Sequence, residues 1–68
     1  MSANEMVKRE ARMASDSLHK SAEICTARVL SVLIMKERDY WRTSLTADEF
    51  TLWNAEFTHL ISDLEVAA

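Results

Sequence analysis

Three side chains in this sequence, Cys25, His19 and His59, have the chemistry to act as nucleophiles or bases near neutral pH. A catalytic cysteine or histidine also needs a group that orients the base and donors that stabilise an oxyanion, and the sequence offers no recognisable set of either. Cys25 falls on an apolar stripe of a predicted helix, which is typical of a small buried hydrophobic residue. A reactive thiol, or one that joins two chains, is the alternative.

Each histidine has a carboxylate four residues further along, Glu23 after His19 and Asp63 after His59. This separation can place two ligands on one side of a helix, but a structural metal site needs about four ligands. The histidines are therefore interpreted as ordinary residues at the edge of an apolar face. We expect no metal, no cofactor and no catalytic set, so the sequence predicts a protein that is not an enzyme.

The composition excludes further kinds of site. The 68 residues include no glycine and no proline, whereas phosphate-binding loops, dinucleotide fingerprints and nucleophile elbows depend on glycine. One cysteine precludes a disulfide within the chain. A chain of this length buries only about 60% of its unfolded surface. The sequence therefore predicts one small domain, residues 1–68, that is completed as a bundle by self-association or by another protein.

The elements that must position these residues are predicted to be helices, because helix-forming residues are abundant and apolar residues recur with helical spacing. A first helix is expected over residues 3–42, with a possible break at residues 15–17, where Ser and Asp side chains compete for backbone hydrogen bonds. Two apolar stripes run along its second half, and one partner helix cannot cover both. One stripe holds Leu30, Ile34 and Trp41, and the other holds Leu18, Ala22, Cys25, Val29, Leu33 and Tyr40.

A second helix has the clearest start signal in the chain. Thr46 as N-cap residue and Glu49 three residues later form a capping box, while Leu45 and Phe50 form the hydrophobic staple around it. These signals predict a helix over residues 47–66. Its apolar stripe consists of Phe50, Trp53, Phe57, Leu60 and Leu64, widened by Leu52 and Ile61. The predicted fold is thus all-α, an antiparallel helical hairpin with a long first helix.

Charge is distributed unevenly between the two predicted helices. Residues 1–42 carry all eight basic and six acidic side chains, or +2, whereas residues 43–68 carry five acidic and no basic side chains, or −5. In an antiparallel hairpin the basic end of the first helix lies beside the acidic start of the second, which also suits both helix dipoles. The side chains concerned are Lys36, Arg38, Arg42, Asp48 and Glu49.

The large apolar side chains have two interpretations, as the core of the hairpin or as an exposed anchor surface for a partner. The predicted protein-binding residues are Leu30, Ile34, Trp41, Trp53 and Phe57. The leading hypothesis is a non-enzymatic protein-interaction module, a small co-chaperone or adaptor. Its expected partner is a second copy of the chain, in a homodimer or higher oligomer, or another protein.

Two other functions remain open as alternatives. Lys8, Arg9 and Arg12 form a small basic cluster, so a dimeric helical hairpin that binds RNA is one of them. Acidic neighbours and a net charge of −3 argue against a nucleic-acid partner. The other alternative is a small inhibitor of the phage or plasmid type, which would bind a host protein.

The apolar segments are short. The longest run covers residues 29–35, and a membrane-spanning helix needs about 20 such residues. The N-terminal residues mix acidic and basic side chains and do not have the pattern of a signal peptide. We therefore expect a cytoplasmic protein without a membrane partner.

Residues 42–64 combine a basic helix end, a short polar turn, and an ordered set of apolar and acidic residues. That set is Phe50, Leu52, Trp53, Glu56 and Leu60. In these features the stretch resembles the YscE-like co-chaperones of type III secretion needle subunits, although it lacks the glycines that such turns often carry. The resemblance implies two antiparallel helices, a second chaperone as partner, and a role in keeping an aggregation-prone needle subunit monomeric.

Overall fold

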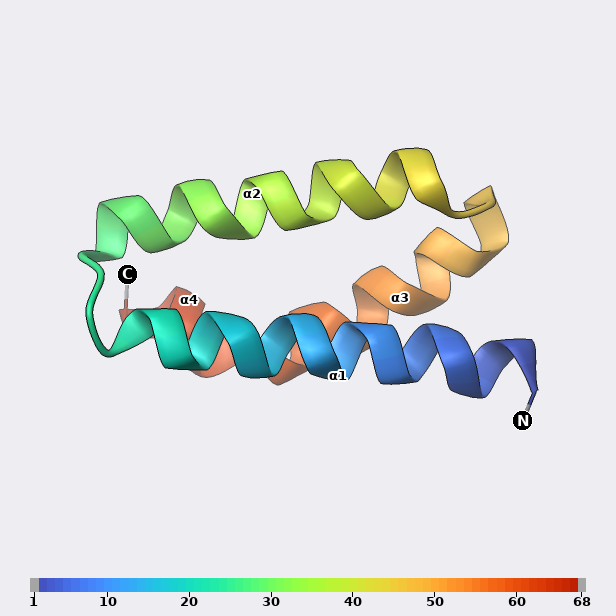
Figure 1. Ribbon diagram of the computed structural model, residues 1–68, viewed down its shortest axis with the longest axis horizontal. Coiled ribbons are helices and arrows are strands. Elements are labelled where there is room, and N and C mark those ends of the chain that lie inside the picture. The colour runs from blue at the N-terminus through green and yellow to red at the C-terminus, as the bar shows by residue number, and fades with distance from the viewer. Residues whose placement is uncertain (1, 68) are drawn as a thin grey trace.

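The structure, a computed structural model, describes residues 2–67, with side chains described for residues 2–65. The helices are α1 (Ala3–Ala22), α2 (Ala27–Ser44), α3 (Ala47–Leu60) and α4 (Ser62–Ala67). Figure 1 shows α1 and α2 running in opposite directions, with α3 and α4 returning behind α1. The predicted all-α class is confirmed.

The chain turns at residues 23–26, so the predicted continuous helix over residues 3–42 is wrong. α1 ends at Ala22 and α2 begins at Ala27. The N-cap residue of α2 is Thr26, whose Oγ1 accepts a hydrogen bond from the backbone N–H of Val29 at 3.3 Å. Residues 15–17, where the sequence allowed a break, lie within α1.

Burial of apolar side chains explains the turn. Leu30 and Ile34 of α2 are buried in the core, and burying a side chain of this size contributes about 1.5–3 kcal/mol. A straight helix over residues 3–42 would be about 60 Å long and would hold these side chains away from the helices that cover them. The free energy gained by burying these side chains therefore exceeds the cost of the few helical hydrogen bonds that are lost at residues 23–26.

The start of α3 follows the predicted capping box. Thr46 Oγ1 accepts a hydrogen bond from the Glu49 N–H at 3.2 Å, and Glu49 Oε1 accepts one from the Thr46 N–H at 3.0 Å. Leu45 and Phe50 are half-buried and pack against the core on either side of this cap. The predicted capping box of Thr46 and Glu49 is therefore present in the structure.

The predicted helix over residues 47–66 is interrupted at Ile61. Its backbone has φ −102° and ψ 11°, outside the α-helical range, and α4 begins at the next residue. Ser62 Oγ donates a hydrogen bond to the carbonyl of His59 at 2.9 Å, which satisfies one of the last carbonyls of α3. The interruption places Ile61 in the core, fully buried.

The core lies mainly between α1 and α3, and one side of α2 closes it. α1 contributes the small side chains Ala11, Ala14 and Ser15 at its centre, which let a neighbouring helix approach closely. α3 contributes Trp53 and Phe57, both fully buried. Small residues opposite large aromatic ones fill the interior at the density that folded proteins reach.

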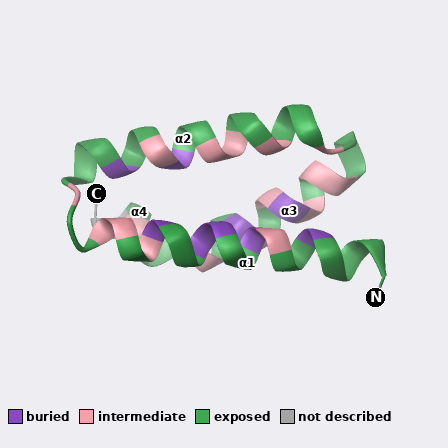
Figure 2. Cartoon of the chain, in the orientation of Figure 1, coloured by how far each residue is buried: buried purple, intermediate pink, exposed green. Residues whose placement is uncertain are grey.

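α2 is packed on one side only. Figure 2 shows its inner side buried or half-buried and the rest of its surface exposed along its whole length. Of the two apolar stripes predicted near residues 29–35, the one with Leu30 and Ile34 faces the core, whereas the other is divided, because Leu33 packs against the core while Val29 and Tyr40 are exposed.

Candidate interaction surface

The structure places the predicted protein-binding residues inside the chain's own core. Leu30, Ile34, Trp53 and Phe57 are buried, and Trp41 is half-buried against them. Trp53 stacks on Phe57 with ring centroids 4.5 Å apart, and Trp41 lies 5.8 Å from Trp53. Of the two interpretations of these side chains, the structure favours the core, and Trp53 and Phe57 are fully buried in this fold.

The exposed apolar side chains of α2 form a different surface, which we call the α2 outer face. It consists of Val29, Val32, Met35 and Tyr40. Val32 is 45% exposed and Met35 60% exposed. Isolated apolar residues are common on protein surfaces, but Val29, Val32 and Met35 follow one another at a spacing of three on a helix whose other side is already packed, and adjoining exposed apolar residues mark interaction sites.

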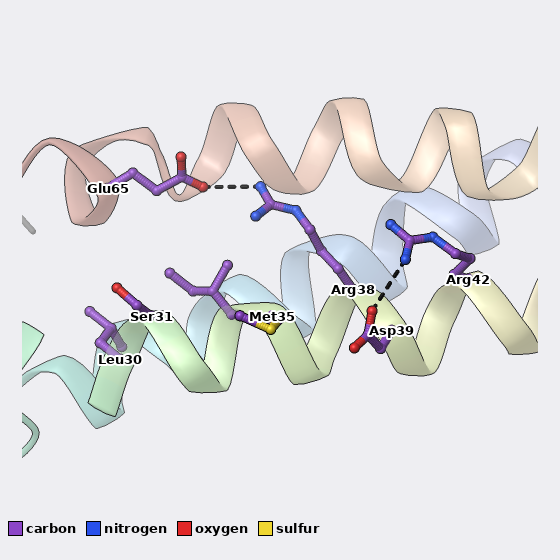
Figure 3. Close-up of a pocket in the computed structure, with 8 residues that line it drawn as sticks. Leu30, Ser31, Met35, Arg38, Asp39, Arg42 and Glu65 are labelled. Carbon is purple, nitrogen blue, oxygen red and sulfur yellow. Dashed lines mark hydrogen bonds and ion pairs between the residues drawn. The ribbon is translucent and has the colours of Figure 1, made fainter. Parts of the chain in front are cut away.

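A groove of about 520 Å³ borders the α2 outer face (Figure 3). Its apolar part is formed by Leu30, Ile34 and Met35 of α2. Arg38 and Arg42 extend from the same helix, and Glu65 of α4 lies across from Arg38. The groove therefore continues the outer face of α2 toward α4.

Arg38 binds α2 to α3 and α4. Its Nε donates to Asn54 Oδ1 at 3.1 Å, and its Nη2 donates to Thr58 Oγ1 and to Glu65 Oε1, both at 3.0 Å. The guanidinium also lies over the ring of Phe57, 5.5 Å from its centroid. These contacts show that Arg38 is part of the scaffold of the groove.

The basic side chains near the end of α2 have other partners than the predicted ones at the start of α3. Arg38 pairs with Glu65 of α4, and Arg42 pairs with Asp39 of its own helix at 3.2 Å. Arg42 also lies over the ring of Phe50, 5.3 Å from the centroid. The acidic segment does meet the basic one, but at α4 instead of at the start of α3.

A second hollow, of about 310 Å³, lies where the start of α1 meets the connection between α2 and α3. Met6, Val7, Trp41 and Leu45 line it, with Glu49 at its edge. Leu45 and Glu49 already serve the helix cap described above. Glu10 of α1 also lines it, so this hollow is an apolar gap beside the cap with one further carboxylate in its lining.

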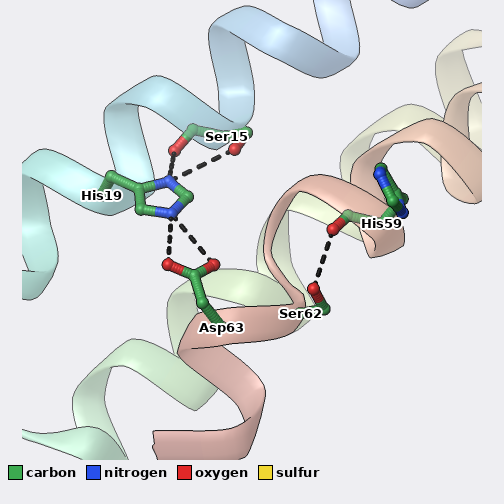
Figure 4. A network of polar contacts seen from close by, with 5 residues as sticks. All are labelled: Ser15, His19, His59, Ser62 and Asp63. Carbon is green, nitrogen blue, oxygen red and sulfur yellow. Dashed lines mark hydrogen bonds and ion pairs between the residues drawn. The ribbon is translucent and has the colours of Figure 1, made fainter.

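Ser15, His19 and Asp63 form a serine–histidine–aspartate cluster between α1 and α4 (Figure 4). His19 Nδ1 donates to the carbonyl oxygen of Ser15 at 2.8 Å and lies 3.3 Å from Ser15 Oγ. His19 Nε2 donates to the Asp63 carboxylate, at 3.0 Å and 3.1 Å from its two oxygens. Neither sequence spacing nor the predicted helix hairpin pointed to this cluster, because its members are far apart in the chain.

The cluster is arranged as an ion pair. The hydrogen bond to the Ser15 carbonyl raises the pKa of His19 above its ordinary 6.5, and the hydrogen bond and charge of Asp63 raise it further, with the charge of Asp16 adding to this. The Ser15 carbonyl and the Asp63 carboxylate are both acceptors, so they favour the protonated ring, in which neither nitrogen has a lone pair for a proton from the Ser15 hydroxyl. The geometry therefore does not make Ser15 a nucleophile.

The remaining candidates from the sequence are separated in space. Asp63 binds His19 of α1 and not His59, its neighbour in sequence, so the predicted ligand pair around His59 does not form. Cys25 lies half-buried in the connection before α2. Among the described residues, no three histidine, cysteine or acidic side chains converge as metal ligands would.

Lys8, Arg9 and Arg12 are exposed on α1. Their spacing puts them on the same side of α1 as Glu5 and Asp16, so the basic surface is interrupted by acid. Within residues 2–67, none of the helices combines the length and hydropathy that crossing a membrane requires.

No family model, curated protein or solved structure matches this chain. Its function is therefore inferred from its own surfaces. Of these, the α2 outer face has apolar side chains that are exposed among the residues the structure describes.

Proposed function

We propose that this protein is a non-enzymatic interaction module, a small co-chaperone or adaptor, whose docking element is α2. The observation that carries the proposal is the contrast between the two sides of this helix. Leu30 and Ile34 are buried on one side, while Val32 and Met35 are exposed on the other. The second apolar side is expected to contact another protein, because leaving it in water costs about 25 cal/mol for every Å² exposed.

The occupant that fits this surface is an amphipathic helix of a protein. α2 is a straight helix of 18 residues, about 27 Å long, and its outer face is a ridge rather than an enclosed pocket. Ridges of this kind pack along the apolar stripe of a second helix. Charged residues, Arg28 and Asp39, stand near the two ends of the face, and they would select a helix with charges of opposite sign.

The resemblance of residues 42–64 to YscE-like co-chaperones supports a chaperone role within this proposal. For a chaperone of this kind, the helix that binds α2 belongs to a small, aggregation-prone secretion substrate. Shielding such a helix requires an apolar docking surface on the chaperone, which the α2 outer face supplies.

Site-specific photocrosslinking in the cells that produce the protein tests the proposal. A photoreactive residue at Val32 is expected to crosslink to a protein, whereas the same residue at the exposed Thr51 of α3 is not. Val32→Glu should abolish capture of that protein, and Thr51→Glu should not. Crosslinking at Thr51 alone, or no protein product at Val32, would contradict the proposal.

RNA binding makes a different prediction in the same experiment. Contacts to phosphates release counterions, so binding should weaken steeply and linearly with the logarithm of salt concentration. Replacing Lys8, Arg9 and Arg12 by Ala should then abolish binding. Under our proposal, the triple variant captures the protein normally and the capture depends little on salt.

A further inference from the structure

Four exposed residues along α2 have a symmetric arrangement of charged and apolar side chains. Arg28, Val32, Met35 and Asp39 are all exposed, and their spacing of four, three and four places them within an arc of about 60° on the helix surface. We call these four residues the α2 stripe. A basic residue lies at one end of the stripe, an acidic residue at the other, and two apolar residues lie between them.

From this symmetry we infer that the partner of α2 is a second copy of the same chain, with the two α2 helices antiparallel about a two-fold axis between Leu33 and Ile34. Each Arg28 then faces the partner's Asp39, and each Val32 faces the partner's Met35. The inference rests on the proposed function and names the occupant of the same surface as a second copy of the chain, in place of the secretion substrate that the family resemblance would put there.

Charge complementarity selects the antiparallel arrangement. A two-fold interface is self-complementary, so a residue at position i meets position j while j meets i. In the antiparallel register both ends of the stripe form ion pairs. A parallel pair in register would instead place Arg28 beside Arg28 and Asp39 beside Asp39, and like charges at an interface are unfavourable.

The neighbouring positions are compatible with this register. Tyr40 would lie over Ala27 of the partner subunit, and Lys36 beside Ser31 of the partner subunit, so no like charges stand directly opposite each other. Asp39 already accepts a hydrogen bond from Arg42 in its own chain, and a carboxylate has acceptor capacity for a second donor.

The surface area of the chain is consistent with a weak dimer. Its accessible surface is 4773 Å², whereas a compact monomer of 7.8 kDa is expected to expose about 4,400 Å². A contact confined to one helix buries less than the 1,200 Å² or so that stable complexes bury. We therefore expect a dissociation constant between about 1 μM and 1 mM.

Analytical ultracentrifugation of charge-reversal variants tests the register. Arg28→Glu and Asp39→Arg should each weaken dimerisation about tenfold, because each replaces two attractive pairs by two repulsive ones. The double variant R28E/D39R should dimerise like the wild type. An equal mixture of the two single variants should form heterodimers, in which both ends are again attractive.

Both reversals agree with the dipole of α2, since they add acid near its N-terminus and base toward its C-terminus, so helicity should be retained in circular dichroism. Lys8→Glu on α1 is the matched control and should not alter dimerisation. If the single variants dimerise as well as the wild type, or the double variant stays monomeric, the antiparallel register is wrong. A chain that is monomeric at about 1 mM yet still crosslinks to another protein through Val32 would overturn self-pairing and leave the proposed function standing.

Discussion

His19 joins the end of α1 to α4 through a charged hydrogen bond, and its stability contribution depends on pH. The pKa of His19 is raised, first by its hydrogen bond to the Ser15 carbonyl. The pKa of Asp63 is lowered from its ordinary 3.8, first by the hydrogen bond from His19. A raised histidine pKa stabilises the fold below about pH 6.5 and ceases to do so as the pH rises through the folded-state pKa. A lowered carboxyl pKa stabilises it above about pH 4 and ceases to do so on acidification.

We therefore predict that α4 is held most firmly between about pH 4 and pH 6.5. In Asp63→Asn the pKa of His19, followed by NMR, should fall toward its ordinary value, and unfolding should depend less on pH above pH 6.5. His59, which is exposed, provides a second imidazole signal in the same spectra as a reference. An unchanged pKa of His19 in Asp63→Asn would show that the two side chains do not pair.

Trp53 combines the largest buried surface in the core with an unpaired donor. Its side chain is fully buried, and its indole N–H has no hydrogen-bond partner among the described residues. Leaving a buried donor unpaired costs about 1–3 kcal/mol, which the stacking of the ring on Phe57 and its burial must exceed.

Trp53→Ala is predicted to lower the free energy of unfolding by about 3–5 kcal/mol, since transfer energy is lost and a cavity is left. Trp53→Phe should cost clearly less, because a ring still fills most of the space and the unpaired N–H is gone. Urea unfolding measures both, with the exposed Thr51→Ala as control. Equal losses for Trp53→Ala and Trp53→Phe would argue that ring packing is not what stabilises this site.

At the scale of the elements, α2 is held less closely by α1 and α3 than these two helices hold each other. α1 packs chiefly against α3, and α2 adds Leu30 and Ile34 to that core along one side. Arg38 supplies the polar part of its attachment through Asn54 and Thr58 of α3 and through α4. The docking helix is therefore held by few side chains.

Arg38→Ala is predicted to loosen α2 and α4 without unfolding α1 and α3. Charged hydrogen bonds of this kind contribute about 1–2 kcal/mol when they are partly exposed, so amide exchange should accelerate in α2 and α4 and change little in α1. Arg38→Lys should give most of the same effect, because lysine cannot reproduce the fork of the guanidinium. Arg42→Ala, which removes the pair with Asp39 and the contact with Phe50 of α3 but no contact with α4, should leave α4 unchanged, and equal effects of the two alanine variants on α4 would contradict this role.

At the scale of the whole molecule, shape and charge both follow from the way the chain folds back. The molecule measures 35 × 20 × 16 Å, much shorter than the about 60 Å of a continuous first helix. Folding back brings the acidic C-terminal segment against the basic one, through Arg38 with Glu65 and His19 with Asp63. The same folding leaves the α2 outer face exposed.

The sequence by itself determined the features that depend on near neighbours in the chain. The helical class follows from composition and spacing, and the start of α3 follows from Thr46 and Glu49, whose two hydrogen bonds span three residues. Thr26 makes a similar cap, but Val29 occupies the position where a capping box has Glu or Gln. The sequence signal at Thr26 is therefore weaker than that at Thr46, and Ser15, Asp16 and Ser17, where a break is predicted as possible, lie within α1.

Only the tertiary structure decided which stripe of α2 faces inward and which charges pair. Leu30 and Val29 are adjacent and both apolar, and the choice between them depends on the surface that α1 and α3 present together. His19 and Asp63 are separated by 44 residues, so their contact exists only after the chain has folded back. Burial of side chains and pairing of charges act between distant segments, and a local sequence pattern does not indicate which segments will come into contact.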